Sequence, residues 1–476
     1  MSQKQDSEIK PGAKVHFIGI GGIGMSGLAQ MLVAEGCIVS GSDRGIDQPE
    51  NQRILNALRA QGIKLFPQDG SYITERPDAL VYSTAIEDDN PDFVVAAGKI
   101  TKIHRSQALE AAINLQKDKN IIAVTGSCGK TTVSSWLAES LFNSGIDASL
   151  LSGGLVNTFT NEKNAGNFKN GQDNYMVFEA DESDKSLLNY SPDYSLVLNI
   201  GTDHYSKEEL IEVFQQFLRQ TKKGAVLSKE VYDMLGSDCV RHLKVILFSG
   251  ELNTAHCDQN CWTLSDYTAN QSQVSTTISI RDQKIILPLP APGIHTAANA
   301  LSIYATLDLL GINTTNIATA ISDFKGVWRR FDYHGLINGA KIYDDYAHNV
   351  EKIISSISAA REITQGGVTI LFQPHGYGPL SFMKDELFKE LERSLESDDI
   401  FCLLPVFYAG GTSSFVPKSE SVISDYQNTG TKQYKYFDTR QAAEAYLKEN
   451  LTVDNTAIVM GARDNSLSDW ANEITQ

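Results

Sequence analysis

Residues 121–132 read IIAVTGSCGKTT, and this stretch decides the fold. A short apolar run of the β type leads into a loop that contains Gly126 and Gly129, and a helical pattern begins directly after it. The loop follows the phosphate-binding pattern GxxxxGK[ST], except that Val124 stands at the position of the leading glycine. The stretch therefore predicts a strand, a phosphate-binding loop and a helix within an α/β domain.

Each residue type in this loop suits a nucleotide triphosphate. Backbone N–H groups of such a loop curl around the β- and γ-phosphates, Lys130 neutralises their charge, and the hydroxyl of Thr131 binds Mg²⁺. We expect Cys128 to be a small filler rather than a reactive thiol. The residues predicted to bind ATP here are Gly126, Ser127, Cys128, Gly129, Lys130, Thr131 and Thr132.

Two further strand ends offer hard ligands for a metal ion. Glu179 closes the strand YMVF and opens the run EADESD, and Asp203 and His204 follow the strand LVLNI. In α/β sheets the ligand lies outside the carboxyl ends of the strands, and Mg²⁺ prefers oxygen ligands. The alternatives are a solvated acidic loop and, for His204, a structural hydrogen bond. After a buried strand in a phosphate-loop domain, we favour a metal role for the acidic cluster, whereas for His204 the residues alone favour the structural hydrogen bond.

A second glycine-rich turn lies near the N-terminus. Gly19, Gly21 and Gly24 form GxGxxG directly after the strand-like run VHFIGI and before a helical pattern, and Asp43 ends the next strand. Glycines here let the backbone approach a pyrophosphate, and the acidic residue can accept hydrogen bonds from a ribose. Taken alone, the motif fits an NAD(P) dehydrogenase, another binder of a diphosphate nucleotide, or a structural turn.

The remaining pattern predicts three successive α/β domains, because strand-like and helical segments alternate along all 476 residues. The expected boundaries are 1–115, 116–327 and 328–476. The third domain opens near KIYDDYAHN and carries the strands VTILFQPHG, DIFCLLPV and TAIVMGARD.

Composition excludes several classes of protein. The 58 acidic and 41 basic residues give a formal net charge of -17, which argues against a nucleic-acid partner. No apolar stretch approaches the ~20 residues that cross a bilayer, and the polar N-terminus has no secretory signal, so we expect a cytoplasmic protein without a membrane partner.

The cysteine pattern agrees with that compartment. Six scattered cysteines predict free thiols in a reducing environment. His256, Cys257 and Cys261 form a small cluster, but no second pair of ligands lies nearby, so a surface loop is favoured over a zinc site.

The motifs TGSCGKTT, EADESD, NIGTDH, GIHTAAN, WRRFD and DDYAHN, together with GIGGIGMSGLA and SGSD, resemble those of the Mur ligase family in family order. The resemblance covers nearly the whole chain. It implies a Rossmann-like N-terminal domain that binds a UDP-sugar and a central P-loop ATPase-type domain that binds ATP. A Rossmann-like C-terminal domain would then contact the amino acid and the nucleotide. A dehydrogenase has no use for a second, ATP-type site.

The resemblance also implies roles for individual residues. Those of the UDP-sugar site are Gly21, Gly22, Gly24, Asp43 and Ser83. Thr131, Glu179 and His204 would bind Mg²⁺, and Lys130 the phosphates. His295 and Asn299 would contact ATP, joined from the C-terminal domain by Arg330 and Asp345. His348 and His375 would line the amino-acid site. The catalytic residues would be Lys130, Glu179, His204, Arg330 and His348.

The implied reaction is ATP-dependent amide formation between the lactyl carboxylate of UDP-N-acetylmuramate and an amino acid, foremost L-alanine, through an acyl phosphate in peptidoglycan precursor synthesis. The alternatives are a tripeptide-recycling ligase on the same UDP-sugar, a ligase for another amino acid, and a weakly active sensor or scaffold. No heptad or apolar stripe distinguishes a monomer from a homodimer.

Three positions depart from the family pattern. Cys128 replaces the usual histidine before GKT, and Thr296 replaces the first asparagine of HNxxN. The stretch QPHGYGPL carries Gly376 and Pro379 where the family usually has arginines, as in QPHRYTR. A charge-assisted hydrogen bond contributes about 1.5–3 kcal/mol, so the loss of one should weaken binding roughly ten- to a hundredfold unless another cation substitutes. The candidates are Arg329, Arg330 and Arg463.

Overall fold

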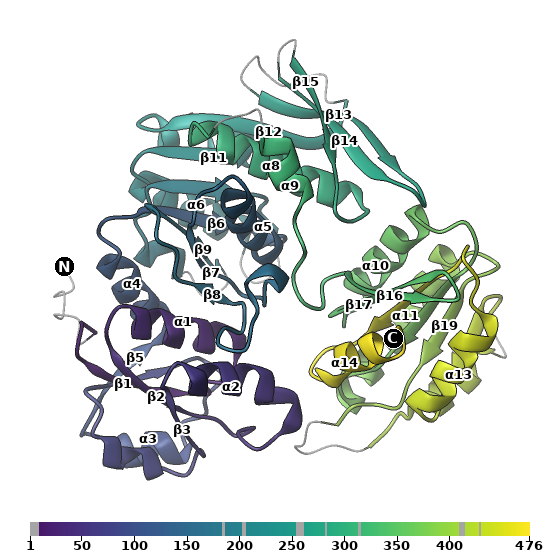
Figure 1. The fold of residues 1–476 in the computed structure, drawn as a ribbon, viewed down its shortest axis with the longest axis horizontal. Coiled ribbons are helices and arrows are strands. Elements are labelled where there is room, and N and C mark those ends of the chain that lie inside the picture. Colours follow the sequence, from purple (N-terminus) through teal and green to yellow (C-terminus); the bar gives the residue numbers. More distant parts are fainter. Residues whose placement is uncertain are drawn as a thin grey trace. The chain divides into compact units, whose positions relative to one another are not determined.

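The computed structural model contains three sheets that follow one another along the chain (Figure 1). The described residues are 9–182, 186–201, 206–253, 261–280, 283–312, 316–408, 415–427 and 430–476. The predicted architecture of three α/β domains is confirmed. No helix in these ranges combines the length and the apolar character that a bilayer crossing requires.

The first sheet is parallel and has the strand order β3-β2-β1-β4-β5. Its central strand KVHFI is buried at four of five positions, as expected for a strand covered on both faces. The strand order reverses at β1, so the glycine turn after β1 lies at the topological switch point. The strands are β1 (Lys14–Ile18), β2 (Ile38–Ser42), β3 (Lys64–Phe66), β4 (Ala79–Tyr82) and β5 (Thr101–His104), and the helices are α1 (Ile23–Ala34), α2 (Gln52–Ala60), α3 (Pro91–Ala96) and α4 (Arg105–Leu115).

The second sheet has ten strands in the order β15-β14-β13-β12-β11-β10-β6-β9-β7-β8. Strand β6 precedes the phosphate loop and has β9 on one side and β10 on the other, both parallel to it. The loop therefore also lies where the strand order reverses. The strands are β6 (Asn120–Thr125), β7 (Ser149–Leu151), β8 (Phe168–Lys169), β9 (Tyr175–Glu179), β10 (Tyr194–Val197), β11 (Gly224–Ser228), β12 (Lys244–Leu252), β13 (Cys261–Ala269), β14 (Val274–Ile280) and β15 (Gln283–Pro288).

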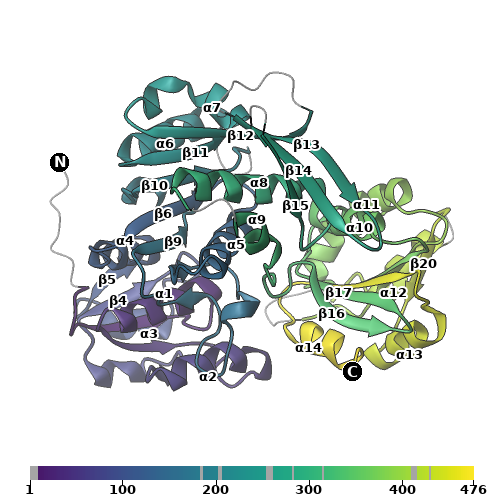
Figure 2. The same cartoon turned by 45° about the horizontal axis from the view of Figure 1, so that its top comes forward.

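Helices α5, α8 and α9 pack on one another beside this sheet (Figures 1 and 2). Trp136 of α5 is fully buried, stacks on Phe324 at 5.1 Å, and donates from Nε1 to the backbone oxygen of Ile321 at 2.8 Å. This packing fixes the helix that begins at the phosphate loop. The helices are α5 (Lys130–Asn143), α6 (Lys207–Gln220), α7 (Lys229–Leu235), α8 (Ile294–Leu309) and α9 (Ile317–Ser322).

The third sheet has the order β16-β17-β21-β18-β19-β20, and only its edge pair β16–β17 is antiparallel among the pairings described. Strands β18 and β21 are buried at every position. The strands are β16 (Asp332–Ile337), β17 (Ala340–Asp345), β18 (Val368–Phe372), β19 (Ile400–Leu403), β20 (Gln433–Tyr436) and β21 (Thr456–Met460). The helices are α10 (Val350–Glu362), α11 (Tyr377–Ser394), α12 (Ser419–Gln427), α13 (Arg440–Asn450) and α14 (Ser466–Glu473).

The chain forms two compact units. One unit contains the first sheet and nearly all of the second, and the other contains Trp328–Gln476 together with Thr268–Val274 and Ala291–Gly293. Within the first unit, buried side-chain hydrogen bonds join the first two sheets. Gln30 of α1 donates to Asn167 Oδ1 at 2.9 Å, and Asn167 Nδ2 donates to Ser26 Oγ at 2.8 Å. The glycine turn and the phosphate loop therefore belong to one unit.

The cysteines differ in part from the prediction. Cys37, Cys128, Cys239 and Cys402 are free thiols, as predicted. Cys261 is disulfide-bonded, so the prediction of free thiols is wrong at this position. His256 and Cys257 lie outside the described residues. A disulfide here depends on the local backbone bringing two sulfurs together, which the count and overall scatter of cysteines do not reveal.

A buried polar network lies beneath the glycine turn of the first domain. The ring of His16 is fully buried, lies 2.9 Å from Ser40 Oγ through Nδ1 and 3.3 Å from Ser42 Oγ through Nε2, and stacks on Tyr72. Ser42 in turn donates to the carboxylate of Asp92. Burial lowers the pKa of His16 from 6.5 to about 3, so the folded protein keeps this imidazole neutral.

We expect His16 to make the protein less stable as the pH falls below 6.5. There the unfolded chain binds a proton that the folded chain excludes, which costs about 1.4 kcal/mol for each pH unit until the folded pKa is reached. Urea unfolding at about pH 7.5 and about pH 5 measures this loss. His16→Gln should show a smaller loss, and the exposed control His242→Gln the wild-type loss. Equal losses for all three proteins would rule out His16 as the cause.

Candidate active site

The phosphate loop is built from two left-handed glycines and a brace from the neighbouring strand. Gly126 has φ +139° and Gly129 has φ +90°, conformations that favour glycine. Asn199, after β10, accepts from the backbone N of Cys128 at 2.8 Å through Oδ1 and donates to the backbone oxygen of Cys128 at 3.0 Å. Ser127 Oγ accepts from the backbone N of Gly201 at 2.7 Å. The loop is therefore held in shape by residues beyond its own motif.

Lys130 begins α5 and bends back over the loop. Its ammonium donates to the backbone oxygen of Gly126 at 2.8 Å and to Glu182 Oε2 at 2.7 Å, with Asp181 Oδ1 at 3.9 Å. The side chain of Lys130 is 14 % exposed and that of Glu182 is 9 % exposed. The ammonium of Lys130, the residue predicted to bind phosphate, is thus paired with a carboxylate in this structure.

Glu179, the last residue of β9, lies against a glycine pair after β7. Its Oε2 accepts from the backbone N of Gly153 at 3.0 Å, and a Cβ on Gly153 would lie 2.6 Å from that oxygen. A Cβ on Gly154 would lie 2.8 Å from Cγ2 of Thr131. The glycines therefore let Glu179 and Thr131 lie close to the same backbone segment. Asp184, Asp203 and His204 lie outside the described residues.

Helix α8 brings a further predicted pair to this unit. Asn299 Oδ1 lies 3.4 Å from the position of a Cβ on Gly129, so this amide borders the phosphate loop. His295 is one turn earlier on the same helix and is exposed, whereas Thr296 is buried. The helix thus places His295 and Asn299 outside its buried face.

The glycine turn of the first domain is braced by Asp43. Its Oδ2 accepts from the backbone N of Gly21 at 2.8 Å, and its Oδ1 accepts from the backbone N of Gly45 at 2.8 Å. Gly19 has φ +75°, which favours glycine at the start of the turn. Asp43 therefore holds the turn itself, in addition to the nucleoside role predicted for it.

A cavity of about 80 Å³ lies between the glycine turn of the first domain and the segment that follows β7 in the second domain. Its lining includes Gly24 of the glycine turn and, from the phosphate-loop domain, Gly153, Glu179 and Asp181. Arg105, the first residue of α4, also lines it, and its Nη1 lies 2.8 Å from the position of a Cβ on Gly24. A cation from the first domain and a carboxylate from the second thus face one space. Ser83 follows β4 and is partly exposed.

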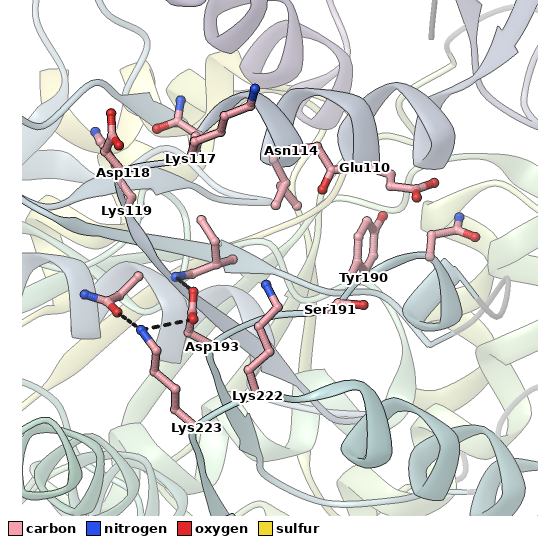
Figure 3. A pocket seen from close by; sticks show the side chains of 15 residues that line it. Glu110, Asn114, Lys117, Asp118, Lys119, Tyr190, Ser191, Asp193, Lys222 and Lys223 are labelled. Carbon is pink, nitrogen blue, oxygen red and sulfur yellow. Dashed lines mark hydrogen bonds and ion pairs between the residues drawn. The ribbon is translucent and has the colours of Figure 1, made fainter. Parts of the chain in front are cut away.

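A larger cavity of about 420 Å³ lies at the amino ends of the central strands of the second sheet. Figure 3 shows the side chains that line it. Its lining includes residues that precede β6, β10 and β11, and none of the predicted site residues. Lys223 there donates to Asn120 Oδ1 at 2.6 Å. It also pairs with Asp193 at 3.1 Å, as Figure 3 shows. The larger cavity therefore does not coincide with the predicted phosphate site, which we expect at the carboxyl ends of the strands.

The C-terminal unit places its predicted residues near the ends of three strands: Arg330 precedes β16, Asp345 and His348 lie at and beyond the end of β17, and His375 follows β18. Asp345 ends β17, and its carboxylate accepts from the backbone N of Phe331 at 2.8 Å and of Ala347 at 2.7 Å. Burial raises the pKa of Asp345 to about 6. Arg330, next to Phe331, is exposed. The carboxylate therefore fixes the backbone that presents Arg330.

His348 and His375 face each other in this unit. Their rings are 5.4 Å apart in an edge-to-face arrangement, and Nδ1 of His348 lies 2.9 Å from the backbone oxygen of Tyr346. Burial lowers the pKa of both rings, and Arg463 lowers each further. Both imidazoles are therefore neutral near neutral pH. Each ring has an unprotonated nitrogen that can accept a hydrogen bond or a proton.

Models of one family match almost the whole chain. They are the Mur ligase family catalytic domain at residues 14–117, the Mur ligase middle domain at 124–307, and the Mur ligase glutamate ligase domain at 329–463. The chain belongs to the Mur ligase family.

Individual relatives align with this chain over nearly its whole length. The UDP-N-acetylmuramate–L-alanine ligase of Sinorhizobium medicae is 32% identical over 96% of this chain and 95% of its own. The enzyme of the same name from Lachnospira eligens is 30% identical over 94% and 95%. The structure of UDP-N-acetylmuramate–alanine ligase from Thermotoga maritima has a TM-score of 0.76 and 25% identity, and covers 97% of this chain and 98% of that one.

The two adjacent arginines of the motif WRRFD have different surroundings in the structure. Arg329 is 1 % exposed, and its guanidinium is bonded to Asp344 and to the backbone oxygens of Gly461 and Asp464. Arg329 has no surface left for a ligand, so the hypothesis that it replaces the missing arginines after QPH is wrong. Arg330 and Arg463 are exposed.

Several residues of the site were missed by sequence reasoning. Arg105, Gly153 and Asn199 contact the predicted residues only because distant segments meet in the fold. Glu182 was recognised as part of EADESD but not as the partner of Lys130. The glycine pair after β7 was the available signal, since adjacent glycines after a strand commonly mark close backbone approach.

Proposed function

We propose that this protein is an ATP-dependent ligase that joins the lactyl carboxylate of UDP-N-acetylmuramate to L-alanine in peptidoglycan precursor synthesis. The names of the relatives support this substrate pair. The observation that carries the proposal is the cavity between the glycine turn and the phosphate-loop domain, where Arg105 and Glu179 face one space. A carboxylate substrate and a phosphoryl donor have to meet in such a place.

In this proposal the first domain holds the UDP-sugar. The amides of Gly21, Gly22 and Gly24 bind its diphosphate, with Asp43 bracing the turn and Ser83 nearby. Backbone N–H groups at the start of a helix favour anions, and α1 starts at Ile23, directly after the turn. Arg105 adds a cation next to Gly24 and so helps to bring the substrate's carboxylate into the cavity.

The central domain binds ATP. The loop from Gly126 to Gly129 surrounds the phosphates, and Lys130 leaves Glu182 to bind them. Ser127, Cys128, Thr131 and Thr132 complete the loop, and Asn299 and His295 contact the nucleotide from α8. The family motifs WRRFD and DDYAHN assign Arg330 and Asp345 of the C-terminal domain to nucleotide binding.

The donor set also fits Mg²⁺. Glu179 has no cationic side chain paired with it among the described residues, and Thr131 adds a hydroxyl. Two protein oxygens leave room for phosphate oxygens and water, as Mg²⁺ commonly requires. We assign Glu179, Thr131 and, from the family motif, His204 to this ion. When bound, it neutralises charge on the transferred phosphoryl group.

The chemistry follows from these groups. An oxygen of the lactyl carboxylate attacks the γ-phosphorus of ATP, the bond to the bridging oxygen breaks, and ADP leaves. The nitrogen of the amino acid then attacks the carbonyl carbon of the acyl phosphate, and phosphate departs as the amide forms. His348, which is neutral near neutral pH, accepts the proton that the amine releases, and His375 lines the same site. Catalysis is otherwise positioning and charge neutralisation by Lys130 and Arg330.

The test is an ATP-dependent phosphate-release screen with UDP-N-acetylmuramate against the common L- and D-amino acids, glycine, and the tripeptide that the recycling ligase joins. We expect turnover with L-alanine to exceed turnover with every other acceptor. Preference for the tripeptide would assign the protein to the recycling reaction, and preference for another amino acid would show a rebuilt acceptor pocket. Absence of turnover with all acceptors would contradict a ligase and favour a scaffold.

A further inference from the structure

We propose that Arg463 binds the carboxylate of the incoming amino acid and so replaces the arginines that are missing after QPH. This inference rests on the proposed ligase function and deepens it. Arg463 would then contribute to amino-acid specificity. It lies in the segment Gly461–Asp464, which directly follows β21.

The sheet register places Arg463 beside the two histidines. Strand β21 lies between β17 and β18 and is parallel to both. Met460 pairs with Asp345 on one side and with Phe372 on the other. His348, His375 and Arg463 each lie three residues beyond these paired positions. His348, His375 and Arg463 thus follow the carboxyl ends of three neighbouring strands at equivalent register positions.

The backbone of this segment is fixed while the Arg463 side chain is exposed. Arg329 donates to the backbone oxygen of Gly461 at 2.5 Å and to that of Asp464 at 3.0 Å, on either side of Arg463. Asp464 Oδ2 accepts from Arg440 at 2.6 Å. Arg463 itself has φ +65°, a left-handed conformation that L side chains rarely adopt. A glycine would fit this backbone with less strain, so the arginine is retained at a cost in stability.

The electrostatics fit an α-amino acid. Arg463 contributes a fixed positive charge, whereas burial keeps the neighbouring imidazoles neutral. The Nδ1 atom of His375 is buried and has no hydrogen-bond partner among the residues described. An amino acid carries a carboxylate, which a guanidinium can bind through two parallel hydrogen bonds. It also carries an amine, whose N–H can donate a hydrogen bond to the unprotonated nitrogen of a neutral imidazole. One cation next to two neutral rings therefore matches both ends of this substrate.

The decisive variant is Arg463→Gly, which removes the guanidinium and suits the left-handed backbone. We expect the KM for L-alanine to rise about 10- to 100-fold, as for the loss of a charge-assisted hydrogen bond. The KM values for ATP and UDP-N-acetylmuramate should stay within about twofold, and Tm should be unchanged or higher. Arg463→Gln, which keeps the size of the side chain, should give the same pattern of KM values.

L-Alaninamide provides a second readout, because it keeps the amine and the methyl group but lacks the carboxylate charge. Wild type should prefer L-alanine to L-alaninamide, and Arg463→Gly should lose most of this preference. The matched control is Arg76→Gly, which replaces another exposed arginine at positive φ (+51°), in the first domain. It should raise Tm to a similar extent and leave every KM and the preference unchanged.

Two outcomes would overturn the proposal while the ligase function stands. One is an unchanged preference for L-alanine over its amide in Arg463→Gly. The other is a rise in the KM for ATP in place of the KM for alanine, which would assign Arg463 to the nucleotide. Failure of the wild-type protein to release phosphate with any amino acid is a separate result, and it would overturn the ligase function together with this inference.

Discussion

Lys130→Ala should lower kcat for phosphate release by about 10²–10³-fold or more, since a preorganised cation at the phosphoryl group contributes at least as much as one hydrogen-bond donor of an oxyanion site. In the structure this ammonium already lies over the phosphate loop, 2.8 Å from the backbone oxygen of Gly126. The variant should still bind UDP-N-acetylmuramate, because the glycine turn belongs to a different sheet. Single-turnover phosphate release and calorimetric titration with the UDP-sugar measure the two effects.

The matched control is Lys223→Ala. Lys223 is also paired with a carboxylate, Asp193 (Figure 3). It directly precedes β11 and so lies at the amino ends of the strands of the same sheet, away from the phosphate loop. We expect wild-type kcat for this variant. An equal loss of kcat in both variants would show that the effect is a general consequence of removing a lysine from this domain, and Lys130 would then have no special role at the phosphates.

The parts of the site that sequence predicts are local in the chain. The strand, loop and helix at residues 121–132 form one continuous segment, and each of its residue types has a physical reason to be there. The same holds for the glycine turn after β1. Because parallel strands bring their carboxyl ends to one edge, the placement of Glu179 at the phosphate-loop edge could also be predicted.

The parts that sequence does not predict depend on contacts between distant segments. Arg105 reaches Gly24, and Asn199 braces Cys128 across 71 positions of the chain. The adjacent arginines of WRRFD illustrate the same limit, since one is buried and the other exposed. Two neighbouring identical residues carry no local signal that distinguishes them. Asp344 on β17 and the backbone oxygens of Gly461 and Asp464 enclose the guanidinium of Arg329, and these partners are distant in the chain.

Arg329→Met is the substitution that should destabilise the C-terminal unit most. Arg329 and Asp344 are 1 % and 0 % exposed, with Nε and Oδ2 3.1 Å apart. Removing the arginine leaves a buried carboxylate without its cation, which typically costs about 3–5 kcal/mol. Urea unfolding of the variant and of the wild-type protein should show this loss. A change below about 1 kcal/mol would mean that the carboxylate finds another partner or water.

The double variant Arg329→Met/Asp344→Leu separates two roles of this arginine. Replacing a buried ion pair by apolar side chains of similar size is often neutral or stabilising, so most of the lost stability should return. The backbone oxygens of Gly461 and Asp464 nevertheless remain without the guanidinium that holds them. If that contact positions Arg463, the KM for L-alanine should be higher in the double variant than in the wild type, although the double variant is again stable. Recovery of both stability and KM would show instead that Arg329 acts only through its ion pair, and that the segment carrying Arg463 keeps its shape without it.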